Sequence, residues 1–183
     1  QSFPSPIDTG ATSLEWVRST EHGWLLVSAG LSGELFLWTP RTCELFSTTD
    51  SNGGAIWATA CYDNGQGASR LAVACDDGCV RLFSVQAEDG AVVYNRTFSK
   101  TGGKALSVAW HSNGDRLASG HSNGGICVWE VATGQELLFV TAAVDAQTEM
   151  CIWRVLMLPN GDIASGDSSG RVAVWDATYG TLL

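Results

Sequence analysis

Apolar and polar residues alternate over short stretches of this chain, and small turn residues separate the stretches. In 105–110 (ALSVAW) small side chains alternate with large apolar ones with a period of two, which is typical of a β-strand. We expect four such strands in this part of the chain, at 105–110, 116–120, 125–130 and 136–140. The separating turns lie at 112–114 (SNG), 122–124 (SNG) and 132–134 (ATG). Glycine adopts positive φ at low cost, so we expect primed two-residue hairpin turns here. Four short antiparallel strands of this kind make one propeller blade.

The same pattern occurs four times along the chain. A glycine lies five residues before an aromatic residue in each copy: Gly33 and Trp38, Gly78 and Phe83, Gly124 and Trp129, Gly170 and Trp175. An aliphatic residue lies twelve positions before each aromatic residue: Leu26, Leu71, Leu117 and Ile163. The aromatic residues are 45, 46 and 46 positions apart, at the long end of the period of WD repeats. No stretch has the pattern of an amphipathic helix.

This repetition predicts an all-β fold, a WD-repeat β-propeller of about four blades. The approximate repeat units are 1–46, 47–95, 96–140 and 141–183. Propellers contain roughly four to eight blades, and most WD propellers have seven. The chain begins at Gln1 and not at a methionine. We therefore expect it to be a segment of a longer protein that supplies the remaining blades of the ring.

The repeats depart from the usual WD consensus. A WD unit usually has a Gly-His pair before its first strand, and that histidine bonds to a serine or threonine, an aspartate and the tryptophan. Ser119 with Trp129 and Ser165 with Trp175 match the serine and tryptophan positions, but no Gly-His pair precedes a first strand. We therefore expect these blades to depend more on apolar packing between sheets than on this polar network.

The charge of the chain limits its direct partners. It carries 10 basic and 19 acidic residues, for a formal net charge of −9, and four basic residues never cluster. Sequence-independent binding of nucleic acid needs lysine and arginine to neutralise phosphates. We therefore expect any RNA partner to be reached through other proteins. No apolar run approaches the length of a membrane span, so we expect no membrane partner.

The six cysteines do not suggest a metal site. They include no CxxC pair, and most lie in apolar runs, where free cysteine behaves as a small hydrophobic residue. Cys75 and Cys79 flank a turn, but they lack the second pair that a zinc site needs. We expect reduced thiols, a reducing compartment (cytosol or nucleus), and no metal or other cofactor.

Catalytic chemistry has little support in the sequence. A Ser/His/Asp triad needs a base held against the nucleophile and a third group that orients the base. The histidines His22, His111 and His121 lie at turns or between strands, and the neighbouring serines and aspartates recur at fixed repeat positions. Turn formation explains them without catalysis. Asp76 and Asp77 offer too few oxygens for calcium, and the glycine-rich stretches at 51–54 and 101–104 lack the spacing of a phosphate-binding loop.

Exposed loops therefore become the candidate partner-binding positions. In propellers, the loops that join the second strand to the third share one face with the loops that join successive blades. The candidates on that face are Asp76, Asp77, His121, Ser122, Asn123, Asp167 and Ser168. The loop from Thr141 to Glu149 is longer than its equivalents, and we expect it to reach a partner.

Several blade motifs resemble those of the cirhin family. These are 52–60 (NGGAIWATA), 75–83 (CDDGCVRLF), 105–111 (ALSVAWH) and 151–163 (CIWRVLMLPNGDI). Cirhin is a tandem-propeller subunit of the UtpA subcomplex, which binds the nascent pre-rRNA leader and nucleates the small-subunit processome with the U-three small nucleolar RNA. The resemblance, which covers the chain from about residue 13, implies several blades of the first propeller.

The resemblance also implies a role and a location. The chain would be a non-catalytic scaffold in ribosome biogenesis, in the nucleolus of the nucleus. Its partners would be other UtpA subunits and processome proteins, with pre-rRNA and the U-three RNA contacted indirectly by this segment. The family has no catalytic residues to carry over, and no motif position identifies an RNA contact.

Two other functions compete with this one. The first is a WD adaptor of another complex, such as a substrate receptor of a ubiquitin ligase. Such receptors often end a repeat with Trp-Asp-x-Arg, whereas here Trp175-Asp176 is followed by Ala177-Thr178, and Trp129 is followed by Glu130. The second is a hydrolase on a propeller, which would require a constellation of residues that breaks the repeat. The sequence shows none.

Overall fold

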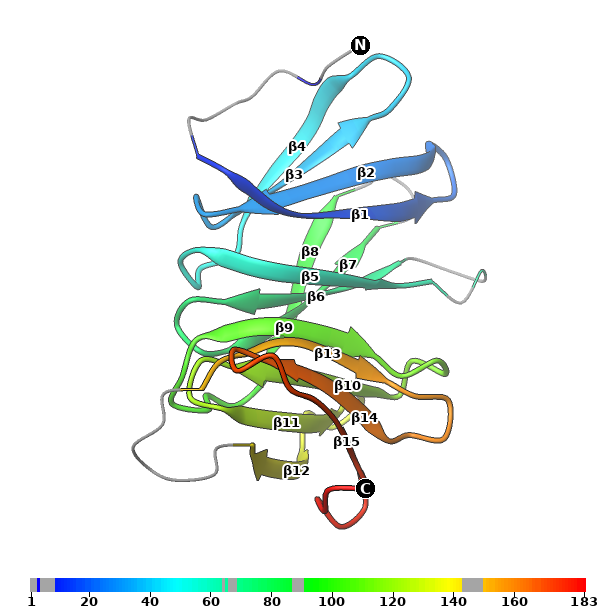
Figure 1. Cartoon of the computed structure of the whole chain (residues 1–183). Coiled ribbons are helices and arrows are strands. Elements are labelled where there is room, and N and C mark those ends of the chain that lie inside the picture. Colours follow the sequence, from blue (N-terminus) through cyan, green and yellow to red (C-terminus); the bar gives the residue numbers. More distant parts are fainter. Residues whose placement is uncertain (1–2, 4–8, 64, 66–68, 87–90, 143–149) are drawn as a thin grey trace.

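The computed structural model describes residues 3, 9–63, 65, 69–86, 91–142 and 150–183. Within these ranges the chain forms strands and turns and no helix, so the all-β prediction is confirmed. The strands build four antiparallel sheets that follow one another along the molecule (Figure 1), and each sheet is made of consecutive strands. We call these sheets blades 1 to 4. This is the architecture of WD-type propeller blades.

The strand bounds are as follows. Blade 1 contains β1 (Ala11–Ser19), β2 (Gly23–Gly30), β3 (Glu34–Thr39) and β4 (Glu44–Asp50). Blade 2 contains β5 (Ile56–Tyr62), β6 (Arg70–Cys75), β7 (Val80–Val85) and β8 (Val92–Thr97). Blade 3 contains β9 (Ala105–Trp110), β10 (Arg116–His121), β11 (Gly125–Glu130) and β12 (Glu136–Thr141). Blade 4 contains β13 (Ile152–Met157), β14 (Ile163–Asp167) and β15 (Val172–Trp175).

Blade 3 has the four strands expected from its alternation pattern, with β10 and β12 each one residue longer than expected. The fourth strands β4, β8 and β12 extend past positions 46, 95 and 140, where the approximate repeat units were divided. They do so because each fourth strand stays paired with the third strand of its blade to the end, as in Glu34 with Asp50.

The core lies between successive blades, and each blade has two different faces. One, the aromatic face, carries the third-strand aromatic residue; the other, the aliphatic face, carries small and branched apolar residues. Phe83 of blade 2 packs against Leu25 and Leu35 of blade 1 in one buried cluster. Trp129 of blade 3 likewise clusters with residues of blade 2, and Trp175 of blade 4 with residues of blade 3. The aromatic face of each blade therefore covers the aliphatic face of the blade before it.

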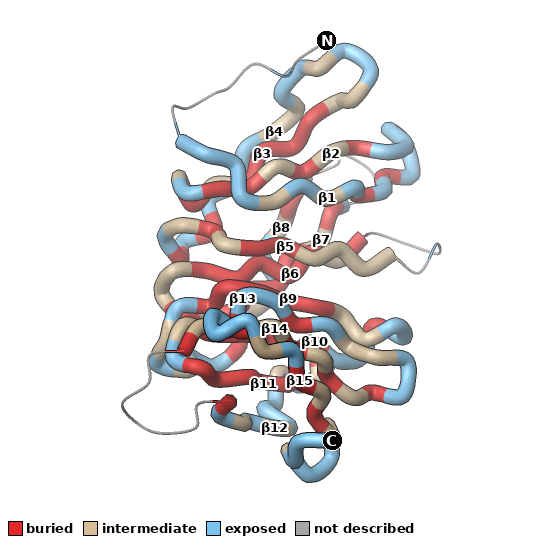
Figure 2. Tube along the Cα trace, viewed as in Figure 1, coloured by how far each residue is buried: buried red, intermediate tan, exposed pale blue. Residues whose placement is uncertain are grey.

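Two blade faces remain open in the part of the chain that the structure describes. The aromatic face of blade 1 exposes Leu14 and Trp16, which retain 62% and 53% of their accessible surface. The aliphatic face of blade 4 exposes Leu156 and Val172. Figure 2 shows the buried residues concentrated in the middle of the stack, with the exposed residues at its two ends and along its rims.

The hairpin turns differ from the primed two-residue type that the sequence predicted, and that prediction is wrong. In the β9–β10 turn the Gly114 N–H donates to the His111 carbonyl at 2.9 Å, and φ is +74° at Gly114. Ser112 and Asn113 are not among the residues with positive φ. The His111 N–H also donates to the Arg116 carbonyl at 3.0 Å, so four residues (112–115) connect the two strands around a turn with a single left-handed glycine, a loop length most often built on a type I turn.

The turns that follow the third strands share a second geometry. The N–H of Gly134 donates to the carbonyl four residues earlier, Glu130, at 2.8 Å, and Gly180 repeats this bond to Asp176. Both glycines have positive φ. Blade 1 has Cys43 at this position, with φ +58° and the same bond to Thr39. A non-glycine residue there is strained, because its Cβ crowds the following carbonyl.

The serine–tryptophan bond of the WD consensus is present in two blades. Trp38 donates from Nε1 to Ser28 Oγ, and Trp175 donates to Ser165 Oγ, each at 2.8 Å. Blade 2 replaces this pair with Val73 and Phe83, which have no polar group to satisfy. In blade 3 the Nε1 of the buried Trp129 has no partner within the described residues.

Candidate partner-binding face

Turns and entry loops lie together on one rim of the stack, which we call the turn face. It comprises the turns between second and third strands and the loops that enter β5, β9 and β13, at the left in Figure 1. The N–H of Asp76, Ser122 and Ser168 donates to Ala55, Lys104 and Cys151, respectively, in the entry loop of the same blade, each at 2.9 Å. These bonds join each turn to an entry loop, so the candidate residues do share one face.

Three candidates use their side chains within the blade. Ser122 Oγ accepts from the backbone N–H of Lys104 at 2.9 Å, and Ser168 Oγ accepts from that of Cys151 at 3.1 Å. Asn123 donates from Nδ2 to the Thr101 carbonyl at 3.1 Å. Each side chain thus holds the loop that enters a first strand, which is a turn-forming role.

His121 lies in the interior, and the prediction of an exposed loop is wrong for this residue. It is the last residue of β10 and is 0% exposed. Its Nε2 is hydrogen-bonded to Ser119 Oγ and its Nδ1 to Thr101 Oγ1, each at 2.6 Å. Burial lowers the pKa of His121 to about 4, so the ring is neutral at pH 7. Ser119 is also 0% exposed. The partner of Nδ1, Thr101, lies in the loop that enters β9, so His121 anchors the entry loop of blade 3.

Asp167 also differs from the expectation of an exposed candidate, because its side chain is 3% exposed. Its carboxylate accepts from Ser169 Oγ at 2.5 Å and from Arg171 Nε at 3.0 Å. The bond from Ser169, and then that from Arg171, lower the pKa of Asp167, although burial opposes them. Arg171 continues to the carbonyl of Ala142 at 2.8 Å. The group therefore closes the β14–β15 turn over the end of the preceding blade.

Asp77 forms a similar closure in blade 2. Its two oxygens accept from Arg81 Nη1 at 3.1 Å and from Nη2 at 2.6 Å, a bidentate pair. Burial raises the pKa of Asp77, but the bonds from Arg81 and Cys79 outweigh it and the net shift is downward. Arg81 Nη2 also donates to the Asn52 carbonyl at 2.9 Å. Arg81 was not predicted as a site residue, and its one signal in the sequence is its position four residues after Asp77.

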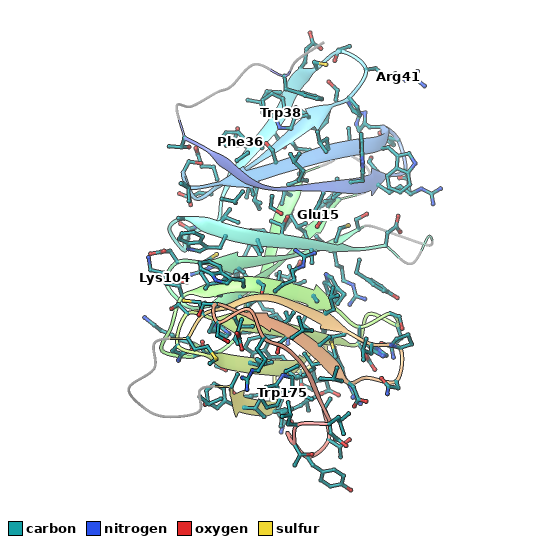
Figure 3. All side chains as sticks on the ribbon, in the orientation of Figure 1. Glu15, Phe36, Trp38, Arg41, Lys104 and Trp175 are labelled. Atoms are coloured by element: carbon teal, nitrogen blue, oxygen red, sulfur yellow. The ribbon has the colours of Figure 1, made fainter. Side chains whose placement is uncertain are left out.

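Asp76 is the candidate whose carboxylate keeps an oxygen without a partner in the described part of the chain, whereas Asn123 and Ser168 are more exposed but use their side chains within the blade. Its Oδ1 accepts from Trp57 Nε1 at 3.0 Å and from Lys104 Nζ at 2.7 Å, and Oδ2 has no partner among the described residues. Lys104 Nζ lies 5.6 Å from the Trp57 ring centroid, within the range of a cation–π contact. The side chains of Asp76 and Lys104 are 36% and 50% exposed. We call Trp57, Asp76 and Lys104 the Asp76 patch; Figure 3 labels Lys104 at the turn face.

The Asp76 patch breaks the repeat. Blades 3 and 4 have serines at the position of Asp76, and those serines cap entry-loop N–H groups. The carboxylate of Asp76 reaches across to blade 3 instead, and its bond to Lys104, followed by that to Trp57, lowers its pKa. Trp57 is the extra residue of a β-bulge between Ile56 and Ala58, and bulges re-aim side chains. Trp57 was not predicted as a site residue, although it belongs to the 52–60 motif.

All six cysteines are free; Cys75 and Cys127 are buried and the other four are partly buried. Across the described ranges no three His, Cys, Asp or Glu side chains gather as a metal site would require. Nor do these ranges contain a helix long and apolar enough to cross a membrane. The long loop from Thr141 to Glu149 lies outside the described residues from position 143 onward.

The topology and a family comparison together define the class of this chain. Residues 86–159 match the family model ANAPC4_WD40, described as the Anaphase-promoting complex subunit 4 WD40 domain. Four consecutive antiparallel sheets with interblade cores agree with this match. The chain is therefore a set of WD-repeat β-propeller blades.

Similarity to individual proteins covers more of the chain than the family model does. The chain is 33% identical over 185 residues, 99% of its length, to the mouse (Mus musculus) protein "U3 small nucleolar RNA-associated protein 4 homolog". It is 31% identical over 96% of its length to "U3 small nucleolar RNA-associated protein 4" of Schizosaccharomyces pombe, and 29% identical over 96% to that of Saccharomyces cerevisiae. The chain spans about a quarter of these relatives: 26%, 24% and 23% of their lengths. These similarities agree with the cirhin-type motifs.

Proposed function

We propose that this chain is part of a non-catalytic scaffold in small-subunit ribosome biogenesis. One observation carries the proposal: a similarity to U3 small nucleolar RNA-associated protein 4 that extends over all four blades in mouse and in two yeasts. In this function the protein is a nucleolar component of the small-subunit processome. It docks other subunits, those of UtpA in particular, during early assembly on pre-rRNA.

The charge distribution supports docking through proteins. With a net charge of −9, the chain cannot neutralise many phosphates, and its two lysines, Lys100 and Lys104, lie in a single entry loop. Pre-rRNA and the U-three RNA are therefore reached indirectly by these blades. A rigid stack with exposed turns on one rim suits contacts with protein partners, since binding residues are concentrated on loops that a scaffold positions.

The Asp76 patch is the docking position that we assign on the turn face. The other candidates hold turns or entry loops, whereas Asp76 leaves one carboxylate oxygen available beside a cation and an indole ring. Tryptophan is enriched among the few interface residues that carry most of the binding energy, so the exposed part of Trp57 beside two charged groups suits a protein contact.

The test uses the tagged full-length protein and sedimentation of a cell extract. We expect the protein to migrate with large pre-ribosomal particles that contain the U-three RNA and the pre-rRNA leader. Asp76→Lys should reduce this association, and Glu44→Lys, the same reversal on the exposed outer strand β4, should not. Absence of the unmodified protein from the particles would overturn the function. Equal behaviour of the two variants would overturn the docking position alone.

A second candidate, a WD adaptor in another complex, is favoured by the match of residues 86–159 to a domain of the anaphase-promoting complex. That match covers less than half of the chain, whereas the similarity to the U3-associated relatives covers nearly all of it. Co-purification with subunits of a ubiquitin ligase, without the U-three RNA, would favour the adaptor.

A further inference from the structure

An open pocket of about 980 Å³ lies on the aromatic face of blade 1, on the rim opposite the turn face. The exposed indoles of Trp16 and Trp24 line it, together with the β1–β2 turn and the β3–β4 turn, which carries Arg41. Figure 3 labels Arg41 at this rim of the stack. Gly23, the first residue of β2, has nothing within 4 Å of the place where a Cβ would lie.

The equivalent place in blade 3 is filled by an arginine of the preceding blade. Trp110 occupies the position of Trp16, since each is paired with the aliphatic residue of its second strand. The guanidinium carbon of Arg70 lies 5.0 Å from the Trp110 ring centroid and 4.8 Å from that of Tyr62. Arg70 Nη2 then donates to the Gly114 carbonyl at 3.0 Å. An arginine from β6 thus joins an indole and the first turn of the next blade.

The junction between blades 3 and 4 repeats part of this arrangement. Arg116 of β10 occupies the position of Arg70, and its Nη1 lies 3.7 Å from the place of a Cβ on Gly161 in the first turn of blade 4. The junction between blades 1 and 2 has Leu25 and Cys61 at the two corresponding positions, both in the apolar core. At two of the three junctions, therefore, an arginine at the start of a second strand reaches the first turn of the following blade.

We propose that the pocket between Trp16, Trp24 and the β1–β2 turn is the seat of an arginine side chain from another blade of the same protein. The indole of Trp16 receives the guanidinium as Trp110 receives Arg70, and a backbone carbonyl of the β1–β2 turn accepts its N–H as the Gly114 carbonyl of the β9–β10 turn does. Glu21, in the same turn, adds a carboxylate to the pocket. The relatives are about four times as long as this chain, so they have length for such a blade.

A second copy of these four blades does not fit the seat. Head-to-tail packing would place the aliphatic face of blade 4 on the aromatic face of blade 1, with Asp162 at the position of Arg70. An aspartate has no cation for the indole of Trp16, and it would bring a second negative charge towards Glu21. The occupant is therefore a blade with arginine immediately before the aliphatic residue of its second strand.

The first experiment replaces Trp16 with photoreactive benzoylphenylalanine in the full-length protein and maps the cross-linked peptide by mass spectrometry. Tyr94, on the outer strand β8, is the matched control, since both side chains are 53% exposed in these four blades. We expect Trp16, and not Tyr94, to yield an intrachain cross-link to a peptide that contains such an arginine. A cross-link to residues 152–175, to a peptide without arginine or to another protein would overturn the proposal, as would no cross-link at Trp16.

The second experiment keeps Trp16 and measures access to the pocket. Glu21→Cys and Leu137→Cys variants of the full-length protein are labelled with a maleimide, and labelling at each new cysteine is followed by mass spectrometry. Leu137 lies on the outer strand β12 and is exposed. We expect labelling at position 21 to be at least about tenfold slower, since a seated arginine and its blade cover the pocket, corresponding to protection of about 1.4 kcal/mol or more. Equal rates would overturn the proposal.

Discussion

Substitution of Asp167 by asparagine tests whether a buried carboxylate closes blade 4. The change keeps the shape of the side chain, and Oδ1 can still accept from Ser169 and from the backbone N–H of Arg171. It replaces Oδ2 with an amide that cannot accept from Arg171 Nε, so one charge-assisted bond of 3.0 Å is lost. Such bonds contribute about 1.5–3 kcal/mol. The Arg171 side chain is 34% exposed and can be partly hydrated, so we expect about 2 kcal/mol, near the lower end of that range.

Native-state hydrogen exchange in the full-length protein measures this loss locally. An opening free energy lower by about 2 kcal/mol raises exchange roughly thirtyfold. We expect that increase in peptides covering β14 and β15, and little change in blade 2. The matched variant is Asp76→Asn, which removes the charge of a pair whose two side chains are 50% and 36% exposed. Exposed pairs contribute about 0–1 kcal/mol, so exchange over β6 and β7 should rise less than about fivefold.

The comparison of these two variants shows whether burial strengthens the ion pair of Asp167 with Arg171. If Asp167→Asn raises exchange in blade 4 no more than Asp76→Asn does in blade 2, burial does not strengthen the Asp167 pair. The assignment of Asp167 as a structural residue, and of Asp76 as an available one, would then lose its energetic basis.

Three further outcomes follow from the geometry. His121 is neutral in the fold, with a pKa lowered to about 4, so the unfolded chain takes up a proton below pH 6.5 that the folded chain does not. Stability should therefore fall by about 2 kcal/mol from pH 7 to pH 5, and urea titrations of His121→Asn should show a smaller fall. Cys43→Gly relieves a left-handed φ and should raise the free energy of unfolding by up to about 1 kcal/mol; a lower urea midpoint would contradict this. Trp175→Phe leaves Ser165 Oγ without its donor, whereas Trp129→Phe removes an unpartnered N–H, so the first should cost about 1–2 kcal/mol more in thermal unfolding.

Local chemistry was enough to predict the blades. The alternation at 105–110 and the glycines that follow it define β9 to β11 almost to the residue, because strand period and turn geometry depend on neighbours in sequence. The turn type was harder to predict, because Gly114 has positive φ both in a primed turn and in the four-residue connection observed. The two turns differ in the backbone conformation of Ser112 and Asn113, and serine and asparagine are compatible with both turns.

Burial of the candidate residues could not be predicted in the same way. His121 and Asp167 follow a glycine at the end of a second strand, and their sequence surroundings resemble those of an exposed turn. Their burial depends on distant groups: Thr101 lies 20 residues from His121, and Arg171 links Asp167 to the Ala142 carbonyl, 29 residues before the arginine. The entry loop of the blade therefore decides which turn residues reach solvent.

Asp76 departs from the role that its position has in blades 3 and 4. Each turn between a second and a third strand must hold an entry loop, and a side chain engaged in that task is not available to a partner. Ser122 and Ser168 perform it through their hydroxyls, whereas in blade 2 the backbone of Asp76 bonds to Ala55 and the carboxylate extends to Lys104 of the next blade. A repeat protein reveals candidate binding residues where a repeated position departs from its structural role, because the fold does not require the departure. This distinguishes Asp76 from candidates that had equal standing in the sequence.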